Sequence, residues 1–170
     1  MILGMSLATF TLVHVILSLI GIFTGLVVLI GMLNSNRLSG LTAVFLATTL
    51  LTSATGFLFP FDKLLPSHIV GIISLVVLAL AIVALYVFRL AASWRWIYVG
   101  SAVLSLYFNV FVAVVQAFLK VPFLSELAPT QKEPPFAIAQ GVVLLAFVVL
   151  GILAVRWFRP RIQGSGLSVA

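Results

Sequence analysis

Residues 2–33 read ILGMSLATFTLVHVILSLIGIFTGLVVLIGML and contain no charged side chain. The hydrocarbon core of a bilayer needs about 20 apolar residues per spanning helix, so this run is longer than one span requires. We therefore expect the first helix either to tilt or to begin in the membrane interface. Similar charge-poor runs recur along the chain, and most of the protein is expected to lie inside a bilayer.

The composition of the whole chain agrees with this first run. Of its 170 residues, 64% are hydrophobic and 7% are charged, and the mean hydropathy is +1.36. Soluble globular domains are about 45–50% apolar and about 25% charged. In lipid, the backbone must satisfy its polar groups internally, and the runs lack the period-2 alternation of a barrel. The predicted fold is an all-α integral membrane bundle, and the absence of cysteine rules out disulfides and thiolate metal sites.

Polar turns and prolines divide the chain into five predicted spans. A polar turn runs from Asn34 to Arg37, and Pro60 and Pro66 flank the turn that holds Asp62 and Lys63. A longer, proline-rich loop precedes the last span. The spans are predicted at about residues 8–32, 41–59, 67–88, 96–119 and 136–158, within one transmembrane domain, 1–162, followed by a flexible cytoplasmic tail, 163–170.

Five spans place the two termini on opposite faces of the membrane. One face receives all the arginines, namely Arg37, Arg89, Arg95, Arg156, Arg159 and Arg161. The other receives the lysines and acids, namely Lys63, Lys120, Lys132, Asp62, Glu126 and Glu133. The positive-inside rule then puts the arginine face and the C-terminus in the cytoplasm and the N-terminus outside. The net charge is +6. Because the basic residues flank the predicted spans, we expect them to contact membrane lipids and not to bind nucleic acid.

The two histidines are predicted to lie toward the outer side. His14 shares a helical face with Ser18, Gly21 and Gly25, a small-residue stripe of the kind that lets helix backbones approach closely. His68 begins the third span from the same side. Each histidine has two interpretations. It is a packed or interfacial side chain, or it binds haem or a metal ion; for His14, proton handling is a further alternative.

The fourth span carries a polar face made by Ser101, Ser105, Asn109, Ala113 and Gln116. An unpartnered amide in hydrocarbon costs several kcal/mol, so this face is expected to point into the bundle, either as interhelical glue or as the lining of a cavity. Gln140 of the fifth span is expected at a depth similar to that of Gln116. The predicted ligand-binding set of an outward-facing pocket is His14, His68, Asn109, Gln116 and Gln140.

The sequence contains no recognisable catalytic motif. It has no H-E-x-x-H, no G-x-S-x-G and no phosphate-cradling glycine loop, and its three acids fall in loops, so a non-enzymatic role is predicted. In the first hypothesis, the polar pocket binds a lipid, a quinone or a partner helix. The alternatives are a small transporter or channel subunit, which would need to form a homo-oligomer, and an electron-transfer protein that holds haem b between His14 and His68.

Four segments carry a resemblance that covers most of the chain. They are T-S-A-T-G-F-L-F-P, P-S-H-I-V-G-I, Y-F-N-V-F-V and L-A-P-T-Q-K-E-P-P-F. Together they resemble small uncharacterised bacterial inner-membrane proteins with several spans. The resemblance implies a bacterial inner-membrane location, and it implies neither an activity nor any functional residue.

Overall fold

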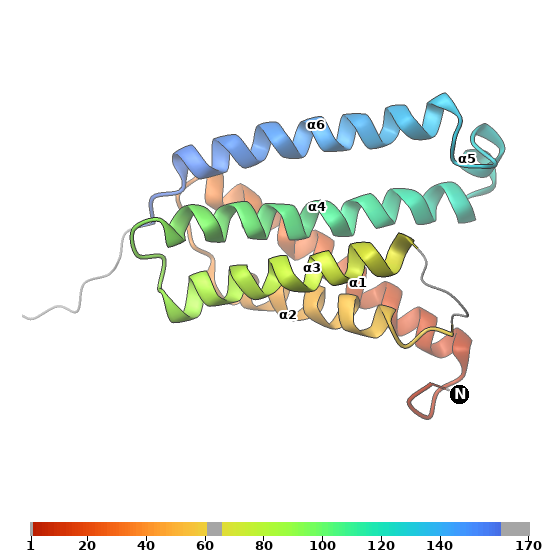
Figure 1. Cartoon of the computed structure of the whole chain (residues 1–170), viewed down its shortest axis with the longest axis horizontal. Helices are drawn as coiled ribbons and strands as arrows, with labels where there is room; N and C mark the ends of the chain where they lie inside the picture. The colour runs from red at the N-terminus through yellow and green to blue at the C-terminus, as the bar shows by residue number, and fades with distance from the viewer. Residues whose placement is uncertain (1, 61–65, 161–170) are drawn as a thin grey trace, which may run out of the picture.

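The computed structural model describes residues 2–60 and 66–160, so the predicted tail and the Asp62–Lys63 turn lie outside the described residues. Five long helices account for most of this part of the chain (Figure 1). They are α1 (Leu7–Leu33), α2 (Ser39–Gly56), α3 (Pro66–Ile82, continued by the π-helical segment η1, Val83–Val87), α4 (Trp94–Lys120) and α6 (Pro134–Trp157).

The predicted all-α bundle is confirmed in the described residues, and five of its helices are long and apolar enough to cross a membrane. The predicted orientation, with the N-terminus outside, stays a prediction. Two local differences from the predicted spans have clear causes. Helix α2 ends at Gly56, before the predicted residue 59, and the aromatic residues that follow it pack sideways against α1 and α3. The loop before α6 contains a short helix, α5 (Pro122–Leu127), which starts with proline at a position where a missing N–H costs nothing.

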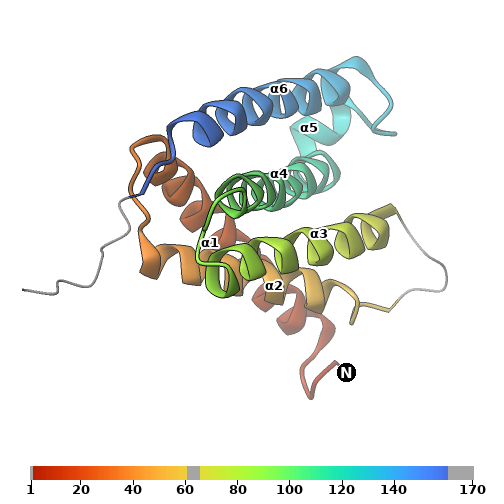
Figure 2. The ribbon, with the colours of Figure 1, turned by 60° about the vertical axis from the view of Figure 1, so that its left-hand side comes forward.

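Helix α4 is the centre of the bundle. It contacts α1, α2, α3 and α6, and two views show it between α3 and α6 (Figures 1 and 2). Helix α6 is peripheral, because its long-helix contacts are to α4 and α1, and Phe147 and Ala154 are its only buried residues. A large part of α6 therefore faces the surroundings, which for a spanning helix means lipid.

The arginine end of the bundle is the end that carries Arg37, Arg89, Arg95, Arg156 and Arg159; the opposite end, with α5, is the loop end. The buried core lies in the half nearer the arginine end. Its largest members include Met32, Phe45, Leu78, Leu85, Tyr98 and Leu106. The predicted polar site residues lie in the other half.

Two glycines of the predicted small-residue stripe lie where α1 crosses α2 and α4. A Cβ added to Gly25 would lie 2.6 Å from Leu106 Cδ1 and 2.8 Å from Phe45 Cε2. A Cβ at Gly21 would lie 3.1 Å from Thr49 Oγ1. The stripe therefore brings three helices together, which is the function that its spacing predicts.

Hydrogen bonds fasten the C-terminal end of α6 at the arginine end. The Ser35 hydroxyl, in the turn after α1, donates to the carbonyl of Trp157 (2.5 Å) and accepts from the backbone N–H of Arg159 (3.1 Å). The Arg95 guanidinium donates to the carbonyl of Phe158. The Ser35 bonds tie the end of α6 to the turn after α1, and the Arg95 bond ties it to the start of α4.

The other end of α6 is ordered by the carboxylate of Glu133, which directly precedes the helix. It accepts from the Thr130 hydroxyl (2.8 Å), from the Thr130 backbone N–H (3.3 Å) and from the Lys132 backbone N–H (3.0 Å). Desolvation, the largest single influence, raises the pKa of Glu133, but these hydrogen bonds together outweigh it, so the pKa lies below its ordinary value of 4.5.

This lowered pKa predicts a pH-dependent opening of the loop before α6. Because the folded pKa lies below the unfolded one, the stabilisation is fully present above about pH 4.5 and is lost as the pH falls through the folded value. We expect amide hydrogen exchange at residues 130–133 to speed up in that acidic range. Glu133→Gln should exchange quickly at neutral pH and show little further change on acidification. Equal, pH-independent protection in both proteins would contradict the assignment.

Candidate functional site

His14 lies on α1 and bonds across to α2. Its Nδ1 is 2.8 Å from the hydroxyl oxygen of Thr55, which itself donates to the carbonyl of Leu51 (2.7 Å). A hydroxyl has one proton to give, so Thr55 accepts here and His14 Nδ1 carries the proton. The Phe59 ring meets the imidazole edge-on, with centroids 5.2 Å apart. These contacts match the packed interpretation of this histidine.

His68, on the first turn of α3, is buried, with 6% of its surface exposed. The ring of Phe57 lies 5.8 Å from it, centroid to centroid, and also packs on Gly71, where an added Cβ would lie 3.0 Å from Phe57 Cζ. Phe57 therefore packs toward α3, whereas Phe59 packs toward α1. The two histidines are thus covered by different aromatic residues of the segment that follows α2.

Asn109 links α4 to α2 close to the crossing point of α1. Its side-chain amide donates to the hydroxyl of Thr49 (3.1 Å), which is fully buried. Gly21 leaves room for this pair, because a Cβ there would lie 3.4 Å from Asn109 Nδ2. The polar face of α4 points into the bundle at this residue, as predicted, and makes an interhelical hydrogen bond.

Two glutamines attach α6 and the preceding loop to α4. Gln140 Nε2 donates to the carbonyl of Phe111 (3.2 Å), and Gln131 Nε2 donates to the carbonyl of Val115 (2.9 Å), one turn further along. The Oε1 atom of Gln140 is buried and has no hydrogen-bond partner. Gln116, by contrast, is exposed. Gln131 has a structural role that its position in a loop did not suggest.

The five predicted site residues are therefore distributed over several helix contacts. His14 joins α1 to α2, Asn109 joins α4 to α2, and Gln140 joins α6 to α4. His68 lies beside Phe57 at the start of α3. Their polar atoms mainly hold helices together, and ligand binding by this set stays a prediction.

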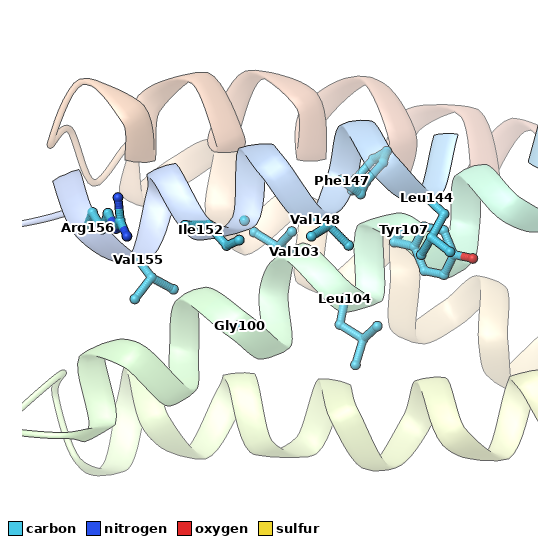
Figure 3. A pocket seen from close by; sticks show the side chains of 11 residues that line it. Gly100, Val103, Leu104, Tyr107, Leu144, Phe147, Val148, Ile152, Val155 and Arg156 are labelled. Atoms are coloured by element: carbon cyan, nitrogen blue, oxygen red, sulfur yellow. The ribbon is translucent and has the colours of Figure 1, made fainter. Parts of the chain in front are cut away.

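A groove between α4 and α6, here called the α4–α6 groove, has a volume of about 380 Å³ (Figure 3). It is lined from α4 by Gly100, Val103, Leu104 and Tyr107, and from α6 by Leu144, Phe147, Val148, Gly151, Ile152, Val155 and Arg156. Leu144, Val148 and Ile152 are about half exposed, at 48%, 48% and 49%, so this wall is open to the surroundings of the bundle. The polar side chains of the lining, Tyr107 and Arg156, lie near its two ends.

Glycines help to shape this groove. A Cβ at Gly100 would meet no atom within 4 Å, and one at Gly151 would lie 3.3 Å from Val103 Cγ1. Gly100 therefore borders open space, whereas Gly151 allows α6 to approach α4. Both lie inside helices, where glycine costs helix stability relative to alanine. That is the sequence signal by which the groove could have been noticed.

A basic pocket of about 560 Å³, here called the arginine pocket, adjoins the groove at the arginine end. It is lined by Arg95, Trp96, Val155, Arg156, Trp157 and Arg159, and it shares Val155 and Arg156 with the groove. The acids of the described residues, Glu126 and Glu133, lie toward the loop end. The combined surface is thus apolar along the helices and cationic at one end.

The sequence and fold were compared with family models, curated proteins and solved structures, and none of them matches this chain. The resemblance to small bacterial inner-membrane proteins therefore stays a prediction, and the candidate site is defined by its own geometry.

Proposed function

We propose that this chain is a non-enzymatic, multi-pass membrane protein that binds a lipid in the α4–α6 groove. The observation that carries the proposal is the polarity of the site, an apolar groove that ends at the guanidinium of Arg156. A lipid has the same division, with apolar chains and a polar headgroup. In this arrangement an acyl chain lies along Val148 and Ile152, and the headgroup lies at the arginine end.

The size of the groove favours a flexible chain over a partner helix. Ligand pockets range from about 300 to 1,000 Å³, and a volume of about 380 Å³ falls within that range. A helix with its side chains is about 10–12 Å across, which is wide for a groove between two adjacent helices. A quinone would also suit the apolar lining, but its ring carries no negative charge to match the arginine pocket.

The other two hypotheses predict different results. A haem protein predicts a Soret band after haem-replete expression, with Nε2 as the ligand atom of His14, because its Nδ1 bonds to Thr55. A transporter predicts liposome flux that falls in Asn109→Leu, although Asn109 bonds to Thr49 across the helix contact. Transport along Asn109 requires an amide that here connects two helices, whereas lipid binding leaves that contact intact. Lipid binding therefore fits the geometry best.

Filling the groove is expected to remove the lipid. Gly100→Phe places an aromatic ring where an added Cβ meets nothing within 4 Å, so it occupies the groove without striking a neighbour at its base. We expect native mass spectrometry with added dioleoyl phosphatidylcholine to show retention at least about tenfold weaker than in the wild type, equivalent to about 1.4 kcal/mol.

The matched control is Gly40→Phe, which makes the same change at an α2 glycine that also has open space around its Cβ. It lies outside the groove and should retain lipid like the wild type. Equal retention by Gly100→Phe and the wild type, with both proteins folded, would remove the groove as the binding site.

A further inference from the structure

We infer that the arginine pocket binds the phosphate of an anionic phospholipid, whose acyl chain occupies the α4–α6 groove. This inference rests on the proposed lipid binding and adds the class of headgroup. Three arginines line the pocket, namely Arg95, Arg156 and Arg159. Guanidinium groups offer several N–H donors in a planar fork that matches phosphate oxygens.

The guanidinium of Arg95 is held in place before any ligand arrives. It lies over the ring of Trp96, with Cζ 5.6 Å from the ring centroid, and it donates to the carbonyl of Phe158. A guanidinium has five N–H donors, so these contacts leave others for a ligand. A donor that is already oriented loses less conformational entropy when it binds.

No described acid competes for these guanidiniums. Glu126 belongs to α5 and Glu133 precedes α6, and both are separated from the pocket by the length of α6. Glu133 also already accepts hydrogen bonds from Thr130 and Lys132. Among the residues that the structure describes, no carboxylate neutralises the positive charge of the pocket, and this charge attracts an anion.

The surroundings of the pocket indicate a lipid phosphate and not a free one. Trp96 and Trp157 are exposed, at 56% and 53%, and amphipathic aromatic rings of this kind lie at headgroup depth. Val155 and Arg156 line both the pocket and the groove, so a headgroup and its chain can occupy the two at once. Basic pockets between membrane helices are a recurring way to bind anionic headgroups.

The test compares two phospholipids that carry the same phosphate but differ in net charge, because the choline ammonium cancels the phosphate charge in phosphatidylcholine. Native mass spectrometry of the full chain is performed with dioleoyl phosphatidylglycerol and with dioleoyl phosphatidylcholine at equal concentration. We expect the wild type to prefer the anionic lipid by at least about tenfold, since each nearby arginine adds to the attraction. In the double variant Arg156→Gln and Arg159→Gln, retention of phosphatidylglycerol should fall about tenfold further than retention of phosphatidylcholine, so that the preference is lost. Arg95 is left unchanged because its bond to Phe158 supports the fold.

The control is the double variant Arg37→Gln and Arg89→Gln, which removes the same charge from the arginine end but outside the pocket. It should keep the preference. An equal loss in both double variants would overturn the inference in favour of a general surface charge effect. Displacement of phosphatidylglycerol by equimolar inorganic phosphate would also overturn it. If the wild-type protein retains both lipids without preference, the headgroup assignment alone is refuted. If it retains neither lipid, the proposed function is refuted as well.

Discussion

Gly25→Leu is expected to disrupt the bundle. Even a Cβ at this residue would lie 2.6 Å from Leu106 Cδ1 and 2.8 Å from Phe45 Cε2, and a leucine adds three more carbons at the same point. Overpacking a core commonly costs about 1–3 kcal/mol, and this crossing should reach at least the upper end of that range. Denaturant titration in detergent, followed by far-UV circular dichroism and size-exclusion chromatography, measures the loss.

The matched control is Gly141→Leu on α6, where an added Cβ meets nothing within 4 Å. It should unfold at the same denaturant concentration as the wild type. Adding Leu106→Ala to Gly25→Leu should recover part of the loss, because it removes one of the two side chains that the leucine strikes. Wild-type stability of Gly25→Leu would show that α1 does not cross α2 and α4 at this glycine.

Asn109→Leu is expected to destabilise the contact between α4 and α2. The substitution removes the amide that donates to Thr49, whose hydroxyl is then left without that donor in a fully buried site. Interhelical hydrogen bonds in membranes have been worth about 1–2 kcal/mol in model peptides, with lower averages in proteins. Unfolding of Asn109→Leu, Thr49→Val and the double variant should give a positive coupling energy.

The same variant separates two functions of Asn109. If the residue only holds helices together, Thr49→Val should lower stability in the same way, and neither change should alter solute flux in liposomes when the protein is folded. If Asn109 lines a transport path, Asn109→Leu should lower flux and Thr49→Val should do so much less. Strict additivity of the two stability losses would contradict a direct bond between them.

The fold class was predictable because only helices and closed barrels satisfy the backbone hydrogen bonds of a chain in lipid. Long charge-free runs in a backbone that must satisfy its own hydrogen bonds give helices, and five such helices are present. The end of α2 was less predictable, because Phe57 and Phe59 are as apolar as a span yet leave the helix to cover two histidines. Their side-chain packing, and not their hydropathy, determines that boundary.

The candidate site was harder to predict for a related reason. Polar residues in a membrane helix suggest a binding site, but the side chains of His14, Asn109 and Gln140 each form a hydrogen bond to a neighbouring helix. The groove is apolar, so its lining has the same composition as any lipid-facing surface. The sequence features that mark the groove are glycines inside α4 and α6 and an Arg-Trp pair at the arginine end of each helix. They indicate a site only when it is known that the two helices lie side by side.

Photo-crosslinking by a phospholipid with a diazirine on its acyl chain tests lipid binding in the α4–α6 groove most directly. The attachment sites on α6 are mapped by mass spectrometry of the full chain in nanodiscs. Ile152 lines the groove and is 49% exposed, whereas Leu145 is more exposed, at 66%, but does not line it. Lipid binding in the groove predicts more adduct at Ile152 than at Leu145, and loss of that excess in Gly100→Phe. Labelling that follows exposure, with Leu145 ahead of Ile152 in both proteins, would contradict the groove as a lipid site.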